Sequence, residues 1–410
     1  MGCLVAVLAY FAAAMLFVFT NSLTDETMWI SIGIGALAGV VTSCVGRIVN
    51  KPRPNIDASQ TQSDEEVRQE PTVDWIPPEQ ANVTPAANKK DKGAIKMVKN
   101  SLCPYCLNVD SIADKSDKNE QNYACISCKS NVPREYVNYG KIPREVVSAV
   151  GFRGHGKTVY FASLFHTLND LASFWPGFYT FAVDEKSLET VRDNAKLLKT
   201  GALPDATLMN FPAPTIVRFS NMPSLGHRFF LFYDTSGEAY ARQSALIQHA
   251  SFVKHSRTVI FIISLDDLEH DGQRAHDLLS VYVQGLTELK GNTKEQRLLV
   301  VFSKADLLEA RLQNQGEIWH YLQTGRLENL GNVKLNQYVK EMKRISKSLG
   351  KFIRYDLKDM QFLNFAQDRF KGVDFCIVSA LGSEPAGARL RDEVTPKRII
   401  DPILWVACNE

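Results

Sequence analysis

The sequence predicts an α/β fold in which a mostly parallel sheet is flanked by helices, preceded by a two-helix transmembrane hairpin and a small module built on four cysteines. Three observations support this prediction. Two long uncharged stretches open the chain, two cysteine pairs follow, and short apolar runs then alternate with helical segments. We therefore divide the 410 residues into a hairpin at 1–50, a flexible linker at 51–98, a cysteine module at 99–140 and an α/β domain at 141–410.

Composition restricts the class of protein. The net charge is +2, with 45% hydrophobic and 22% charged residues, so the chain is neither a strongly basic nucleic-acid-binding protein nor a disordered one. Four of its eight cysteines are scattered in apolar runs, unlike the cysteines of a secreted disulfide framework. We expect no specific nucleic-acid partner.

The first 50 residues predict two membrane-spanning helices. Residues 2–20 and 28–46 carry no charge, and each stretch approaches the roughly 20 residues that cross a ~30 Å hydrocarbon layer as a helix. Arg47, Lys51 and Arg53 follow, which places this flank in the cytoplasm by the positive-inside rule. A cleaved signal peptide is the alternative, but the chain begins without a basic residue. We expect a multi-pass protein of the bacterial inner membrane, with the lipid bilayer as a partner and both termini cytoplasmic.

The stretch before the α/β domain predicts a tether and then a metal site. Residues 51–98 are too polar to offset their ordering entropy by burial, which favours a flexible linker. Cys103 and Cys106 form one Cys-x-x-Cys pair, Cys125 and Cys128 form a second, and eighteen residues separate the pairs. Two such turns close a tetrahedral four-sulfur site around Zn²⁺. We predict a structural zinc ribbon, with redox thiols as the alternative.

A phosphate-binding loop follows the first apolar run of the α/β domain. The run 146–150 leads into a segment from Gly151 to Thr158 that fits Gly-x-x-x-x-Gly-Lys-Thr and precedes an apolar helix. The glycines that free backbone N–H groups to face phosphate oxygens are Gly151, Gly154 and Gly156. Lys157 is placed to reach the β and γ phosphates of a nucleotide, and Thr158 to bind Mg²⁺. His155 is a further polar candidate in this loop.

Three later motifs also follow predicted strands. The apolar strand 228–233 ends in Asp234, which is placed to hold the Mg²⁺ shell. Gly237 follows and offers an N–H to a γ-phosphate. The two remaining motifs are Ser303, Lys304, Ala305 and Asp306, and then Ser379, Ala380 and Leu381.

In these four motifs and their order, the domain resembles the Ras-like and translation-factor-like P-loop GTPases of the TRAFAC type. The resemblance implies a P-loop GTPase fold over 141–410 that binds GTP or GDP with Mg²⁺. It implies that Asp306 pairs with the guanine N–H groups, that Lys304 lies along the base, and that Ala380 offers its N–H to the guanine oxygen. A carboxylate that adenine would leave unpaired accounts for the discrimination. The implied base site also includes Ser303, Ser379 and Leu381.

The resemblance also implies catalytic roles, and departures from the family pattern modify them. The implied catalytic residues are Lys157, Thr207, Gly237 and Glu238. Glu238 stands where many Ras-like members carry a water-orienting Gln, and a carboxylate beside a γ-phosphate repels it, so we expect slow hydrolysis. Ser303 replaces the usual Asn, which predicts weaker support of the phosphate loop. Arg153 is a catalytic candidate, with a solvent-facing loop residue as the alternative.

Two intervals between the motifs complete the prediction. The family expects a threonine that closes over Mg²⁺, and we choose Thr207, in the loop after Pro204, over Thr200 and Thr215. The interval of about 307–372 is longer than a compact GTPase needs and predicts an insertion. The glycine-rich phosphate loop and the long first excursion are also similar to those of bacterial double-GTPases of conflict systems.

These features predict a membrane-anchored GTPase that acts as a molecular switch. Its regulatory or effector protein partners are unknown from the sequence. A P-loop ATPase is one alternative. A nucleotide-binding scaffold with little hydrolysis is another, and Glu238 favours it.

Overall fold

The computed structural model describes residues 96–408, apart from 118, 266–271, 309–311, 326–333, 388 and 391–392. These residues belong to one compact unit, Trp75–Glu410. They form a seven-stranded sheet covered by helices, and a smaller four-stranded sheet. The predicted α/β fold is therefore confirmed for this part of the chain, with a mixed sheet.

Membrane insertion through two helices is a prediction that we correct. Within the described residues, no helix combines the length and the apolar character that a bilayer crossing requires. The longest helix there, α11 (Leu335–Phe352), has 18 residues and carries a row of lysines. The expected spans at 2–20 and 28–46 lie outside the described residues. The finding for the described residues contradicts the predicted lipid-bilayer partner and the predicted multi-pass membrane location with cytoplasmic termini, and both predictions are wrong.

The large sheet has the strand order β11-β10-β9-β5-β8-β7-β6. Its parallel strands are β5 (Arg144–Val150), β8 (Gly226–Tyr233), β9 (Thr258–Ser264), β10 (Arg297–Ser303) and β11 (Gly372–Ile377). Antiparallel strands β7 (Thr215–Met222) and β6 (Tyr179–Ala182) complete the other edge. Strands β9 and β10 are apolar between their end residues because both of their faces are covered. Their parallel direction brings the carboxyl ends of β5, β8, β9 and β10 to one end of the sheet.

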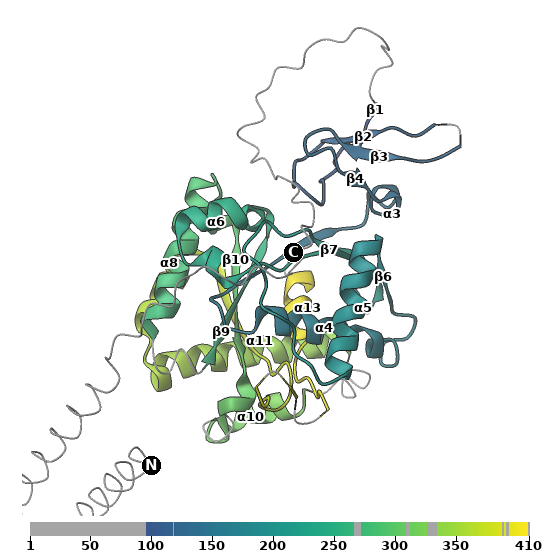
Figure 1. Cartoon of the computed structure of the whole chain (residues 1–410). Helices are drawn as coiled ribbons and strands as arrows, with labels where there is room; N and C mark the ends of the chain where they lie inside the picture. The colour runs from purple at the N-terminus through teal and green to yellow at the C-terminus, as the bar shows by residue number, and fades with distance from the viewer. Residues whose placement is uncertain are drawn as a thin grey trace, which may run out of the picture. The chain divides into compact units, whose positions relative to one another are not determined.

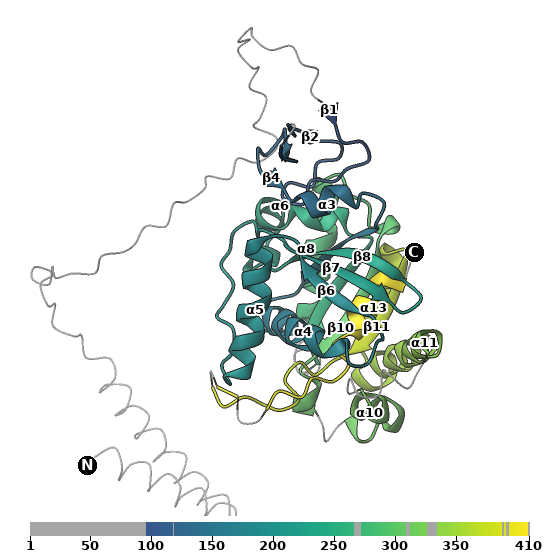
Figure 2. The same cartoon turned by 90° about the vertical axis from the view of Figure 1, so that its right-hand side faces the viewer.

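Helices cover both faces of the large sheet (Figures 1 and 2). In Figure 1, one side carries α6 (Gln243–His249) and α8 (Gly272–Glu288), and the other carries α4 (Lys157–Leu171), α5 (Glu185–Lys199) and α13 (Asp401–Cys408). Ten of the fifteen residues of α4 are buried, because α4 packs between the sheet and α5. This packing holds α4 in place, and so it also holds the first residues of α4, which follow the phosphate loop.

The small sheet is antiparallel and lies in the predicted cysteine module, except for its first strand, which falls at the end of the predicted linker. Its strands are β1 (Lys96–Met97), β2 (Ile112–Asp114), β3 (Tyr123–Cys125) and β4 (Asn131–Val132), and α3 (Arg134–Asn138) follows them. Strands this short bury little apolar surface, so a module of this size usually needs a metal or a docking partner for stability.

The predicted insertion contains α10 (Gly316–Gln323), α11 and α12 (Met360–Arg369). The apolar face of α11 packs along β11, the edge strand of the sheet. The Ser346 hydroxyl of α11 accepts a hydrogen bond of 2.9 Å from the backbone N–H of Phe375. The helix therefore covers an edge that could otherwise pair with another chain.

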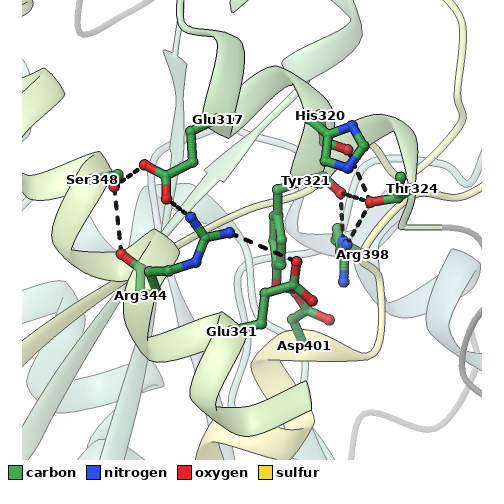
Figure 3. A network of polar contacts seen from close by, with 9 residues as sticks. All are labelled: Glu317, His320, Tyr321, Thr324, Glu341, Arg344, Ser348, Arg398 and Asp401. Atoms are coloured by element: carbon green, nitrogen blue, oxygen red, sulfur yellow. Dashed lines mark hydrogen bonds and ion pairs between the residues drawn. The ribbon is translucent and has the colours of Figure 1, made fainter. Parts of the chain in front are cut away.

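A polar network joins α10, α11 and α13, and Figure 3 shows the part of it around Tyr321, Arg398 and Asp401. Asp401 is fully buried and accepts hydrogen bonds from the hydroxyls of Tyr321 and Tyr338. The guanidinium carbon of Arg398 lies 3.4 Å from the centroid of the Tyr321 ring, and Arg398 Nε donates to the Tyr321 carbonyl at 2.7 Å. Burial raises the pKa of Asp401, and the charge of Arg398 opposes that rise.

We expect Asp401→Asn to lower the free energy of unfolding by about 3 kcal/mol, because it leaves the buried Arg398 without its counter-charge. Urea denaturation measures this loss. Arg344→Gln is the matched control, since it breaks the ion pair between Arg344 and Glu317 (Figure 3). The Arg344 side chain is 55% exposed and the Glu317 side chain is 40% exposed. The control should cost less than about 1 kcal/mol. Equal losses of unfolding free energy in the two variants would contradict the role of Asp401 as the counter-charge of Arg398.

Candidate functional site

The predicted phosphate loop connects β5 to α4 and is shaped by its glycines. Gly154 and Gly156 have φ angles of +88° and +83°, in the left-handed region that side chains rarely adopt. Gly156 is also the N-cap of α4. A Cβ on Gly151 would lie 2.5 Å from the Ile262 carbonyl oxygen of β9, so the loop can pass this strand only with glycine there. The backbone N–H groups of the loop therefore lie at the start of a helix, where they suit an anion.

Lys157 is the first residue of α4 and is only 6% exposed. Its Nζ donates to the carbonyl oxygens of Gly151 at 2.7 Å and Phe152 at 3.0 Å. Burial lowers the pKa of Lys157 to about 8, and the nearby charge of Asp234 opposes this shift. The ammonium group is thus held by its own loop, in a place where a bound anion would stabilise its charge.

Three residues predicted to supply oxygen ligands to Mg²⁺ meet beside Lys157. Thr158 Oγ1 lies 2.7 Å from Thr207 Oγ1, and Thr207 Oγ1 donates to Asp234 Oδ2 at 3.1 Å. Burial raises the pKa of Asp234, and the hydroxyls and Lys157 oppose that rise. Asp234 Oδ1 is buried and has no hydrogen-bond partner among the described residues. Two hydroxyls and a carboxylate with a spare oxygen fit the oxygen ligands that Mg²⁺ prefers.

The turn after Asp234 lies directly against the phosphate loop. A Cβ on Gly237 would lie 2.1 Å from the backbone nitrogen of Arg153, so only glycine fits. Arg153 and Glu238 then form an ion pair, with Arg153 Nη1 3.4 Å from Glu238 Oε1. Their side chains are 75% and 51% exposed, so the pair itself contributes little stability. The pair does place the Arg153 guanidinium beside the Glu238 carboxylate, at the position where many Ras-like GTPases carry a glutamine.

Ser303 forms a hydrogen bond to the phosphate loop. Its hydroxyl donates to the carbonyl of His155 at 2.8 Å and is 3.2 Å from the Ile263 carbonyl. The Ser303 side chain therefore contacts the phosphate loop, and whether this support is weaker than that of an asparagine stays a prediction. The His155 side chain is buried, with Nδ1 3.1 Å from the Ile262 carbonyl oxygen. His155 therefore contacts β9 through its ring and contacts Ser303 through its backbone.

The predicted base-recognition residues meet at the ends of β10 and β11. Ser379 Oγ donates to Asp306 Oδ1 at 2.5 Å and accepts from the Gly382 N–H at 3.0 Å. The Ala380 carbonyl accepts a hydrogen bond of 2.6 Å from Ser163 in α4. These contacts tie the last motif to the helix of the first motif. The Asp306 carboxylate retains a second oxygen for another donor.

These groups surround a cavity of about 750 Å³, a size typical of small-molecule sites. The predicted residues that line the cavity are Gly154, Gly156, Lys157, Thr158, Thr207, Gly237, Glu238, Ser303, Lys304, Asp306, Ala380 and Leu381. The predicted residues outside its lining are Gly151, His155, Asp234 and Ser379. Each of those four hydrogen-bonds to a residue of the lining.

One further part of the lining consists of the neighbours of Thr207 in its loop, since the sequence had assigned only Thr207 itself to the site; these neighbours are Leu203, Pro204, Asp205, Ala206, Leu208 and Met209. A second further part is the pair Glu384 and Pro385. In the Thr207 loop Leu208 is 76% exposed and Met209 is 41% exposed. Pro204 had served to place Thr207 in a loop, but no motif assigned its neighbours to the cavity.

The four predicted cysteines form a compact cluster. Their Sγ atoms all lie within 4.8 Å of one another. The Cys103–Cys128 and Cys106–Cys125 sulfur distances are 3.7 Å and 3.6 Å. A tetrahedral site with Zn–S bonds of about 2.3 Å needs sulfurs about 3.8 Å apart. The donor set and its spacing therefore fit a zinc ion.

Comparison with known proteins gave one family match. A family model described as Double-GTPase 2 matches residues 145–374. This range begins in β5 and ends in β11, so it includes the phosphate loop, the Asp234 turn and the Asp306 segment. No curated protein sequence matches the chain.

Several solved structures are similar at low sequence identity. A GTP-binding protein of the archaeon Sulfolobus solfataricus in complex with GDP is 16% identical with a TM-score of 0.28, over 67% of this chain and 56% of that one. The GTP-bound Ski7 GTPase-like domain of S. cerevisiae is 10% identical with a TM-score of 0.29, over 66% and 51%. Signal recognition particle receptor SRb of Chaetomium thermophilum is 16% identical with a TM-score of 0.25, over 60% and 94%. The chain spans about half the length of the first two.

The contact between Gly237 and the phosphate loop predicts a large steric effect. We expect Gly237→Ala to destabilise the fold by about 1–3 kcal/mol, because the new Cβ meets backbone that must move. Gly316→Ala is the control, since a Cβ there meets nothing within 4 Å. Thermal unfolding of both variants checks the prediction. A Gly237→Ala variant as stable as the control would refute the close packing.

Proposed function

The chain belongs to the Double-GTPase 2 family, and we propose that it binds GTP with Mg²⁺ and hydrolyses it to GDP and phosphate as a molecular switch. One observation carries this proposal. The four nucleotide motifs, which span more than 220 residues from Gly154 to Leu381, contribute side chains to a single cavity. The phosphate-binding groups lie at one part of its lining and the base-recognition groups at another.

The phosphate loop would hold the triphosphate. On binding, Lys157 Nζ would exchange the carbonyls of Gly151 and Phe152 for the β and γ phosphate oxygens. The N–H groups at the start of α4 would face the same anion. Mg²⁺ held by Thr158, Thr207 and Asp234 would neutralise charge on the phosphates.

Hydrolysis would depend on the turn after Asp234. The Gly237 N–H lies beside the phosphate loop, where it would donate to a γ-phosphate oxygen. Glu238 would orient the attacking water less well than a glutamine, because a carboxylate is repelled by the phosphate. Arg153, at 3.4 Å from Glu238, reduces that repulsion. We infer slow intrinsic turnover that a partner protein would accelerate.

Base recognition would rest on Asp306. Its free carboxylate oxygen would accept hydrogen bonds from guanine, while Ser379 holds the other oxygen. Adenine lacks the matching donors and would leave a desolvated carboxylate unpaired. Lys304, with a φ angle of +56°, turns the chain so that its side chain can lie along the base.

The switch would be the loop that carries Thr207. Thr207 contacts both Thr158 and Asp234, so its position depends on the oxygens that would surround the metal. Hydrolysis and phosphate release would remove part of that support and free the loop. The exposed Leu208 and Met209 would move with it.

We further propose that the cysteine cluster binds zinc as a structural ion. The sulfur distances of 3.6 Å and 3.7 Å support this, and all four positions are filled by protein thiols. A closed four-sulfur site leaves no position for a substrate, so its contribution is to folding.

The assignment of Asp306 predicts a change of base preference. Wild type should bind GTP far more tightly than ATP, and Asp306→Asn should bind xanthosine triphosphate better than GTP, because an amide donates where the carboxylate accepted. Titration calorimetry with the three nucleotides measures this. Equal affinity of wild type for ATP and GTP would indicate an ATPase.

Phosphate release tests hydrolysis separately. Release that persists in Lys157→Ala would reject hydrolysis at this site, and undetectable release in wild type would favour a scaffold.

The low pKa of Lys157 predicts a pH-dependent affinity. Nucleotide-free Lys157 is charged below pH 8 and loses its proton as the pH rises above about 8. Bound phosphates favour the ammonium, so Mg·GDP binding at pH 9 should take up close to one proton, and the affinity should fall by up to about tenfold per pH unit. Calorimetry in two buffers of different ionisation enthalpy measures the uptake. Lys157→Arg stays charged and should show none. Absence of uptake by wild type at pH 9 would disprove the shift.

A further inference from the structure

The first turn of the cysteine cluster docks on the α/β domain through two tyrosine hydroxyls. Tyr233, the last residue of β8, donates to the Pro104 carbonyl at 2.6 Å, and this contact is buried. Pro104 follows Cys103 directly. In the other direction, Tyr105 donates to Asp184 Oδ2 at 3.1 Å. Asp184 is the N-cap of α5 and accepts the N–H of Ser187 at 2.7 Å with its other oxygen, so the turn contacts a strand end and a helix start at once.

Tyr233 packs against two phenylalanine rings as well as bonding to the cysteine turn. Its side chain is fully buried, and its ring stacks on Phe252 with centroids 4.6 Å apart and planes inclined by 11°. Phe211 contacts both rings, with centroids 6.4 Å from Tyr233 and 6.0 Å from Phe252. Phe211 follows the loop that carries Thr207. Tyr233 is therefore packed between the cysteine module and that loop.

The residue after Tyr233 is Asp234, the carboxylate of the proposed magnesium site. Asp234 accepts from Thr207 at 3.1 Å, and Thr207 lies 2.7 Å from Thr158. A continuous set of contacts thus runs from Pro104 through Tyr233 and Asp234 to Thr158. These contacts connect the cysteine turn to the oxygens of the proposed magnesium site.

Other contacts prevent the module from rotating away instead. Glu135 of α3 forms an ion pair with Arg218, whose side chain is 11% exposed. Arg144 of β5 donates to the Tyr136 carbonyl at 2.9 Å, and its guanidinium carbon lies 4.5 Å from the centroid of the Tyr136 ring. The module is therefore fixed to β5, β7 and β8.

We propose that Tyr233 is a positioning residue that couples the four-cysteine module to the nucleotide site. Zinc binding to the cysteines fixes the Pro104 carbonyl, which fixes Tyr233 and the carboxylate beside it, and so raises the affinity for Mg·GDP. By linkage, Mg·GDP raises the affinity for zinc by the same factor. The coupling rests on the proposed function and on a zinc-loaded module.

The test uses the full chain and two affinities. The zinc affinity is measured by competition with 4-(2-pyridylazo)resorcinol, with and without saturating Mg·GDP. The GDP affinity is measured by fluorescence of methylanthraniloyl-GDP. In wild type, Mg·GDP should tighten zinc binding by about tenfold, within the usual range for coupled sites. In Tyr233→Phe, GDP should bind about tenfold more weakly, and zinc affinity should no longer respond to Mg·GDP.

Tyr282→Phe is the matched control. Tyr282 is also fully buried, and its hydroxyl donates to Gln296 at 2.8 Å, away from the cysteine module. This variant should lose stability but keep the zinc response. Tyr105→Phe removes only the Asp184 contact and should give an intermediate response, which supplies a second variant if Tyr233→Phe does not fold.

The outcomes separate the two proposals. If wild type binds GDP but its zinc affinity is the same with and without Mg·GDP, the coupling is overturned and the nucleotide site stands. A wild type that binds GDP but no zinc overturns the coupling in the same way. A chain that binds zinc but neither GDP nor GTP overturns the proposed function, and the coupling falls with it. A zinc response retained in Tyr233→Phe would overturn the role of this residue.

Discussion

Close backbone packing at the carboxyl ends of β5, β8 and β9 is the constraint on which the cavity depends. Gly151 lies against the Ile262 carbonyl and Gly237 against the Arg153 amide, at separations that leave no room for a Cβ. The phosphate loop is thereby confined between its two neighbouring strands. Its N–H groups are set in place by the fold itself, so a ligand does not have to spend binding energy on ordering them.

The same packing buries two opposite charges. Burial lowers the pKa of Lys157 and raises the pKa of Asp234, so each charge alone is disfavoured by loss of solvent. Each also stabilises the other, which keeps both shifts smaller than burial alone would make them. A phosphate would stabilise the ammonium and a divalent cation the carboxylate. The cavity is therefore electrostatically suited to take the two together.

The parts predicted from the sequence are those that depend on local pattern. The strands have short apolar runs, the phosphate loop has its glycines, and the cysteine pairs are close in sequence. Contacts between remote residues could not be predicted in this way. Glu238 lies 85 positions from Arg153 and Ser303 lies 148 from His155, and no sequence spacing relates either pair.

The direction and the surroundings of a side chain could not be predicted from the sequence either. The His155 ring turns toward β9 because β9 offers a carbonyl there, a fact of tertiary packing rather than of the loop motif.

The docking of the cysteine module also has a consequence for the order of events during synthesis. The Tyr233–Pro104 hydrogen bond joins residues 129 positions apart. At roughly 5–20 residues per second, a ribosome needs about 6–26 s to make that interval. The cysteines leave the exit tunnel well before the strand they dock on exists. During that time the small sheet has only its own short strands and any captured ion to hold it, so metal availability in the cell can decide whether a competent docking surface is waiting when β8 arrives.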